Sequence, residues 1–176
     1  GDGYTVSPAE NLMPERNTSL NVGFLYDLTG RAASNLQIEV NAFYMYLQHM
    51  IRYTKGILGA QYQNFGEMRT MGVEAEVKAD ITPWLYGYAN ATFQDLRDVR
   101  EHDEGSSLPN PTKGLRMPNI PYLMGNAGLE FHHENLFGGR GQNTRLFSDL
   151  SFVEEYLYYF EMAADQRRIP RSTTVD

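Results

Sequence analysis

One short segment near the middle of the chain alternates strictly between apolar and charged residues. On an extended backbone the apolar residues Val73, Ala75 and Val77 lie on one side. The charged residues Glu74, Glu76 and Lys78 lie on the other side. A period of two is produced by a β-strand with one apolar face and one polar face. Such a strand fits a soluble sandwich, and it also fits a membrane barrel whose apolar face meets lipid.

The same alternation recurs along the chain between turn-forming residues. The further segments that we predict to be strands are 17–27, 36–47, 84–96, 126–132 and 144–160. Together with 62–77, they predict an all-β fold in which about six strands, and the start of a seventh near Ile169, form an antiparallel up-and-down meander. In segment 84–96, aromatic residues on one face alternate with mostly small residues on the other. The sequence therefore does not show which face of that strand would meet lipid.

Composition excludes several classes of protein. The net charge is −7 and no block of Lys and Arg occurs, which argues against nucleic-acid binding. The chain has no cysteine, which excludes a disulfide framework, thiolate catalysis and a cysteine zinc site. No apolar run approaches the roughly 18 residues of a membrane-spanning helix, whereas a barrel strand needs only about 9–11 residues.

The connections between the predicted strands alternate in length. Segments 28–35, 79–83 and 136–143 are short, whereas 48–60 and 97–121 are longer. Outer-membrane barrels have this arrangement, with tight periplasmic turns and longer extracellular loops.

Residues 64–76 carry the most specific motif, Asn-x-Gly-x-x-x-Thr-x-Gly-Val-Glu-Ala-Glu. This run resembles a signature late in the barrel of TonB-dependent outer-membrane receptors. Segments 12–27, 88–95, 117–122 and 125–129 resemble further pieces of the C-terminal half of such a receptor, in the same order. The resemblance covers roughly the whole chain.

The resemblance implies a segment of a transmembrane β-barrel of about 22 strands with a plug in its lumen. Such receptors lie in the outer membrane of Gram-negative bacteria and import a scarce solute: siderophore-bound iron, a vitamin or an oligosaccharide. The implied partners are outer-membrane lipid, the remaining strands and plug, the TonB complex acting through the plug, and the imported small solute. We expect residues 1–176 to be a partial barrel domain without a plug domain or TonB box, because so few strands cannot close around a plug.

No motif predicts catalysis, a metal site or a cofactor. His132 and His133 are adjacent, so on a strand their side chains point to opposite faces. The same argument separates Glu154 from Glu155, and the glycine-rich turn at 138–141 lacks the lysine of a phosphate-binding loop. We therefore predict that the chain is not an enzyme.

Any solute contact in this chain is expected in the long connections, at 48–61, 97–115 and 161–168. Tyr53, Tyr62, Arg100 and His102 are the candidate contact residues, because their side chains can stack on or hydrogen-bond to a polar ligand.

Two alternatives remain open at this stage. The first is a soluble or surface β-sandwich that binds carbohydrate or protein, which would suit the 12 tyrosines. It requires the apolar faces of 17–27 and 36–47 to pack on each other. The second is a β-rich hydrolase, which requires two carboxylates close in space.

Overall fold

The computed structural model describes residues 12–31, 34–56, 59–103, 107–160 and 167–176. These residues form one seven-stranded antiparallel sheet in the order β1-β2-β3-β4-β5-β6-β9, and a two-stranded sheet of β7 and β8. The strands are β1 Arg16–Arg31, β2 Ser34–Gly56, β3 Gly59–Thr82, β4 Leu85–Asp98, β5 Leu123–Glu134, β6 Asn143–Val153, β7 Tyr156–Leu157, β8 Arg168–Ile169 and β9 Ser172–Val175. The described residues contain no helix that could span a membrane. The predicted all-β meander is confirmed.

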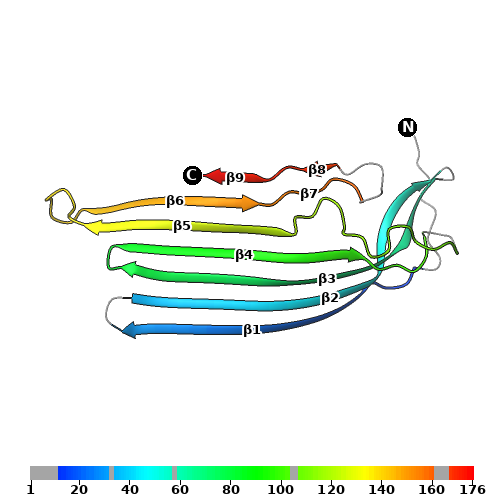
Figure 1. Cartoon of the computed structure of the whole chain (residues 1–176), viewed down its shortest axis with the longest axis horizontal. Coiled ribbons are helices and arrows are strands. Elements are labelled where there is room, and N and C mark those ends of the chain that lie inside the picture. The colour runs from blue at the N-terminus through cyan, green and yellow to red at the C-terminus, as the bar shows by residue number, and fades with distance from the viewer. Residues whose placement is uncertain (1–11, 32–33, 57–58, 104–106, 161–166) are drawn as a thin grey trace.

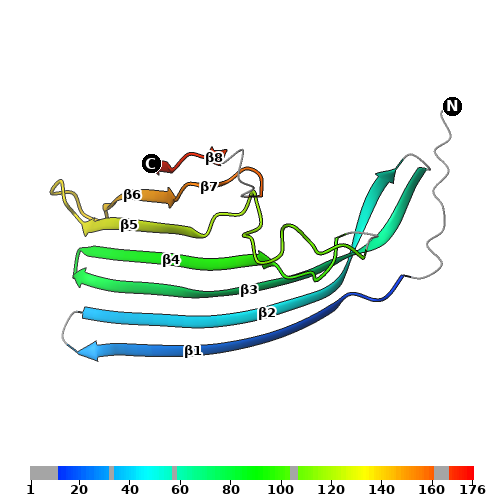
Figure 2. The ribbon, with the colours of Figure 1, turned by 45° about the vertical axis from the view of Figure 1, so that its right-hand side comes forward.

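The connections sort to opposite ends of the sheet. In Figure 1 the strand pairs β1–β2, β3–β4 and β5–β6 turn over at the left, where the tight connections lie. The β2–β3 hairpin and the long β4–β5 segment lie at the right, and Figure 2 shows the same separation after a turn of the view. We call these the short-turn end and the long-loop end.

The strand register places all of the apolar rows on one side of the sheet. Phe24 lies opposite Val40, Val40 opposite Ala75, and Ala75 opposite Ala91. The row then continues through Gly125 to Phe152. Among the described residues no second layer packs on this apolar face: Leu20, Val22 and Phe24 are 64%, 64% and 62% exposed.

The uncovered apolar face decides against the β-sandwich alternative. A sandwich needs the apolar sides of the first two strands to face each other. Instead β1 and β2 are neighbours in one sheet, paired from Arg16 and Gln48 to Arg31 and Ser34. The only buried hydrophobic side chain among the described residues is that of Leu157, so a packed core is absent from this part of the chain.

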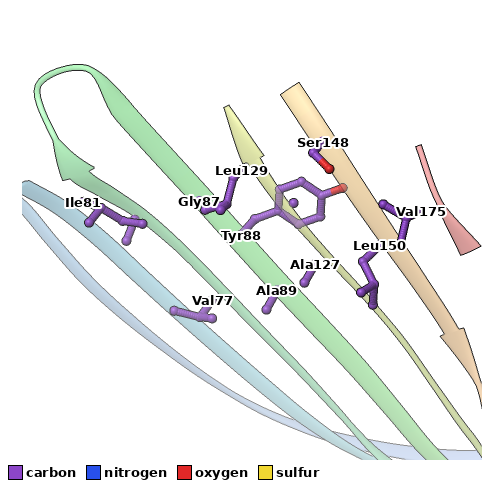
Figure 3. Close-up of a pocket in the computed structure, with 12 residues that line it drawn as sticks. Val77, Ile81, Gly87, Tyr88, Ala89, Ala127, Leu129, Ser148, Leu150 and Val175 are labelled. Carbon is purple, nitrogen blue, oxygen red and sulfur yellow. The ribbon is translucent and has the colours of Figure 1, made fainter. Parts of the chain in front are cut away.

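Pairing with the neighbouring strands also assigns the faces of β4. Ala89 lies between Val77 and Ala127, so the small residues of β4 belong to the apolar face. Tyr86 and Tyr88 therefore belong to the other face. Figure 3 shows the middle of the apolar face, where Ala89 and Ala127 form a shallow hollow. Larger side chains line the sides of this hollow: those of Val77, Ile81, Leu129, Leu150 and Val175.

The largest differences from the predicted strand boundaries lie at the β2–β3 connection and at the end of β6. The predicted connection at 48–60 is mostly strand, because β2 and β3 continue pairing up to Gly56 and Gly59. The predicted strand 144–160 ends at Val153. Beyond it, Glu154 pairs with Arg171 and Glu155 with Arg168, and the chain turns into β7, which pairs with β8.

Aromatic rings cover two glycines on the polar face. A Cβ added at Gly72 would lie 2.5 Å from the Phe43 ring and 2.2 Å from the Phe93 carbonyl oxygen. A Cβ at Gly128 would lie 2.4 Å from the ring of Tyr88. These glycines let the rings lie flat against the backbone of the neighbouring strand.

We predict that Gly72→Ala destabilises the sheet by about 1–3 kcal/mol, because the added methyl group meets a backbone atom that cannot rotate away. Gly23→Ala is the matched control, since its Cβ would lie at an ordinary 3.7 Å from Asn41. Denaturant midpoints of the two variants and the parent protein check this. Equal midpoints for the two variants would contradict it.

Candidate functional site: the long-loop end and the polar face

Asn64 fastens three segments together at the long-loop end. Its Oδ1 accepts a hydrogen bond from the Met13 amide at 2.7 Å, and its Nδ2 donates to the carbonyl oxygens of Met13 and His49, both at 2.7 Å. His49 has a positive φ of 56°, and the β2–β3 register shifts on both sides of Met50. Beyond this irregularity the hairpin bends away from the plane of the sheet (Figures 1 and 2).

Gly66 lies on the other strand of the same irregularity. Its φ of 151° is a conformation that residues with a Cβ rarely adopt. A Cβ there would lie 2.2 Å from the Arg100 Cδ, so the aliphatic part of Arg100 lies against the glycine. The Asn and first Gly of the motif at 64–76 therefore shape the bend and seat the β4–β5 segment on it.

Asp98, at the end of β4, is the centre of a buried polar cluster. Its side chain is 2% exposed. Arg100 donates to it from Nη2 at 2.6 Å, from Nε at 3.0 Å and from its backbone amide at 3.0 Å. The Thr112 hydroxyl donates at 2.7 Å, and Asn110 accepts from the Thr112 amide at 3.0 Å. This cluster ties residues 110–115 to the end of β4.

The same cluster keeps Asp98 ionised. Burial raises the pKa of the carboxyl group, but the hydrogen bonds from Arg100 and Thr112 outweigh burial and lower the pKa to about 2. Backbone hydrogen bonds complete the attachment, since the Asp98 amide donates to Leu115 and the Gly114 amide donates to Asp98. The β4–β5 segment is thus a structured cap on one part of the sheet's end.

The polar face of the sheet carries an acidic patch. Glu39 and Glu76 lie directly opposite each other on β2 and β3, and Glu74 is on the same face two residues away. Lys78 pairs with Glu76. Uncharged side chains form hydrogen bonds between the neighbouring strands on the same face. The Ser151 hydroxyl donates to Asn126 Oδ1 at 2.8 Å, and Asn126 Nδ2 donates to Asn90 Oδ1 at 3.2 Å.

The whole of this chain, residues 1–176, matches the family model described as TonB dependent receptor-like, beta-barrel. The chain belongs to the TonB-dependent receptor β-barrel family. Receptors of this family are outer-membrane transport proteins rather than enzymes. No curated protein matches the chain.

Two solved structures are similar to this barrel segment. The ferric yersiniabactin uptake receptor FyuA from Yersinia pestis superimposes with a TM-score of 0.65 at 17% identity, over 99% of this chain and 24% of its own. The copper transporter OprC gives a TM-score of 0.61 at 19% identity, over 94% of this chain and 23% of its own. The segment therefore spans about a quarter of the length of these structures, and at this identity they support the fold alone.

The structure divides the four predicted contact residues between the projecting β2–β3 hairpin and the β4–β5 segment. Tyr53 and Tyr62 are directly opposite each other on the projecting β2–β3 hairpin, and Tyr62 is 48% exposed. Arg100 is engaged by Asp98 in the buried cluster. His102 is exposed and forms a backbone bridge with Pro109 in the β4–β5 segment. Of the predicted contact segment at 161–168, residues 161–166 lie outside the described part of the chain.

Sequence reasoning missed the buried cluster itself. Asp98, Asn110 and Thr112 are spread over a segment that reads as a polar connection, and their convergence depends on how that segment folds back. The Asp-x-Arg pattern at 98–100, directly after an alternating strand, was the only local signal. The described residues contain no group of three His, Asp or Glu side chains placed to hold a metal ion.

We predict that Asp98→Asn frees the β4–β5 segment from the end of β4. The substitution leaves Arg100, whose side chain is 12% exposed, without its charged partner. We expect a cost of about 3 kcal/mol, the low end for breaking a buried ion pair. Hydrogen exchange of the amides of Asn110 and of residues 112–115 should become roughly 100-fold faster.

Glu101→Gln is the control for this prediction. It removes the ion pair between Glu101 and Lys113, both of which are well exposed. Exposed ion pairs contribute little, so exchange at 110–115 should stay near the parent rate. If the two variants exchange alike, Asp98 is not the anchor of the segment.

Proposed function

We propose that residues 1–176 form part of the wall and extracellular loops of a Gram-negative outer-membrane receptor that imports a scarce solute. The observation that carries this proposal is a single sheet whose two faces differ, with an apolar face that no other described residues cover and a polar face that bears carboxylates. A barrel wall needs both faces, because one meets lipid and the other meets the lumen.

The apolar band has the height that a bilayer requires. On β4 it runs from Leu85 to Phe93, comparable to the roughly 9–11 residues of a tilted membrane-spanning strand. Aromatic pairs lie at both limits. Trp84 and Phe131 are in edge contact at 5.7 Å at the short-turn end, and Phe93 and Tyr122 are at 6.5 Å toward the long-loop end. Such girdles mark the two membrane interfaces of a barrel.

The outer strands of the sheet support the remaining strands of a receptor as partners. β1 and β9 each pair on one side within the sheet. In lipid, an unpaired strand edge costs several kcal/mol per polar backbone group, so each edge needs a neighbour. In this proposal residues 1–176 are a partial barrel domain, and the plug and the TonB-contacting segment are supplied by other parts of the protein.

The acidic patch on the polar face supports a partner in the lumen. Glu39 and Glu76 are directly opposed, and like charges in that position destabilise a sheet. Lys78 offsets only part of this repulsion, because among the described residues it pairs with Glu76 alone. A cationic surface of the plug, through which the TonB complex would act, or a cationic group on the solute would relieve this repulsion.

The projecting hairpin is the part that we propose reaches the solute. Tyr53 and Tyr62 place two aromatic residues opposite each other beyond the bend held by Asn64. Among siderophore-bound iron, a vitamin and an oligosaccharide, this proposal favours siderophore-bound iron, because the two similar structures are a ferric yersiniabactin uptake receptor and a copper transporter.

We predict that Val40→Arg destabilises the protein in lipid vesicles by about 2–4 kcal/mol, the cost of an arginine at the middle of the bilayer. Its neighbour Asn41 lies on the polar face, so Asn41→Arg should change stability far less. Denaturant titration of the full-length protein that contains this segment, folded into vesicles, measures both. Similar costs for the two variants would rule out lipid on the apolar face.

We predict that Tyr62→Ala weakens solute binding by roughly 5- to 10-fold, the effect of removing an exposed aromatic contact. Ferric siderophores, cobalamin and oligosaccharides would be titrated against the full-length protein by calorimetry. Tyr86→Ala, at the short-turn end, should bind as the parent does. Unchanged affinity for a solute that does bind would remove the hairpin from the site, and no binding by any class would overturn the import proposal.

A further inference from the structure

Three arginines lie side by side on adjacent segments at one limit of the apolar band. Arg69 on β3 is directly opposite Arg97 on β4, and Arg97 forms a backbone bridge with Arg116. Tyr46 on β2 extends the row on its other side. Arg69 lies an even number of positions from Val73 on β3, and Arg97 lies an even number of positions from Phe93 on β4, so each arginine shares a face with that apolar residue. This arginine row therefore belongs to the apolar side of the sheet, at the long-loop end.

The carboxylates near the arginine row do not balance it. Asp95 accepts from Arg97 Nε at 2.6 Å and from Arg116 Nε at 2.7 Å, so one carboxylate serves two arginines. Glu67 accepts a hydrogen bond from the Tyr46 hydroxyl at 2.6 Å. Arg69 has no ion pair among the described residues, and its Nε is buried without a hydrogen-bond partner.

An arrangement of this kind is unfavourable unless an anion joins it. Like charges directly opposite on paired strands repel. A buried N–H without a partner costs roughly 1–3 kcal/mol. The repulsion between the two guanidinium groups would be relieved by an acceptor with several oxygens placed between the Arg69 and Arg97 side chains. Phosphate is such an acceptor, since guanidinium groups bind it through paired hydrogen bonds.

The surroundings of the arginine row indicate an amphipathic ligand rather than a free ion. The next row toward the middle of the sheet contains Leu20, Tyr44 and Met71, which are 64%, 40% and 38% exposed. On the other flank, the Arg116 guanidinium lies over the Tyr122 ring at 4.7 Å. A molecule with a phosphate head and hydrocarbon chains would meet both kinds of surface at once.

We propose that Arg69, Arg97 and Arg116 bind the phosphate of an anionic lipid at the long-loop end of the apolar face. This site rests on the proposed function, because it requires the apolar face to lie in lipid. The arginines would fix the height of the barrel wall in the membrane by attracting headgroups. Each arginine near an anionic membrane surface contributes a factor of roughly 5 in affinity.

The test uses the full-length protein in a neutral detergent and counts bound lipids by native mass spectrometry. The probes are phosphatidic acid, zwitterionic phosphatidylcholine with the same acyl chains, and inorganic phosphate as competitor. Arg69→Gln is the informative variant because Arg69 has no partner to lose in the described structure. Arg69→Lys keeps the charge, and Arg145→Gln removes an arginine from the polar face of β6.

We expect the parent protein to retain phosphatidic acid in preference to phosphatidylcholine, and Arg69→Gln to bind it roughly 5-fold more weakly. Arg69→Lys should recover part of the affinity, and Arg145→Gln should match the parent. Equal retention of the two lipids, or no effect of Arg69→Gln, would overturn the lipid site. Full displacement by inorganic phosphate at equal concentration would assign the arginines to a soluble anion and also overturn it.

The vesicle stabilities of Val40→Arg and Asn41→Arg separate this proposal from the proposed function. If Val40→Arg is costly and Asn41→Arg is not, the apolar face lies in lipid, whatever the result for Arg69. If the two variants cost the same, the barrel-wall proposal fails together with the lipid site that depends on it.

Discussion

The apolar sheet face, which no second layer covers in the described part of the chain, is the constraint on which the rest of this structure depends. The ladders from β1 to β9 satisfy the backbone hydrogen bonds within the sheet, but they leave side chains such as Val22 and Phe24 more than half exposed. In a soluble domain a second layer would have to cover them. Lipid removes that requirement, and it adds the requirement that every strand edge be paired.

The long-loop end solves a different physical problem, because its connections must hold a shape without a hydrophobic core. They do so with polar anchors. Asn64 joins the hairpin to the chain before β1, and Asp98 gathers Arg100 and Thr112 at the end of β4. Hydrogen bonds to charged groups are directional as well as strong, so these anchors define where the hairpin and the cap begin.

The motif at 64–76 now has a physical explanation for several of its positions. Asn64 holds the bend through its hydrogen bond to the His49 carbonyl oxygen, and Gly66 adopts the positive φ that the bend requires. Gly72 lets the Phe43 ring approach the backbone. Glu74 and Glu76 project onto the polar face. The motif thus encodes one strand that bends at the long-loop end, admits an aromatic ring on one face and carries apolar residues on the other.

The sequence by itself determined the strands, their order and the alternation that makes one face apolar, because side chains on a strand alternate with a fixed period of two. It also predicted Tyr53 and Tyr62 as contact residues, Tyr53 in the connection at 48–60 and Tyr62 at the start of the next strand. Only the tertiary structure decided the faces of β4, the pairing of Tyr53 with Tyr62, the capture of Arg100 by Asp98, and the row of Arg69, Arg97 and Arg116. Each of these depends on register between strands or on a long segment folding back, and local residue patterns carry no information about either.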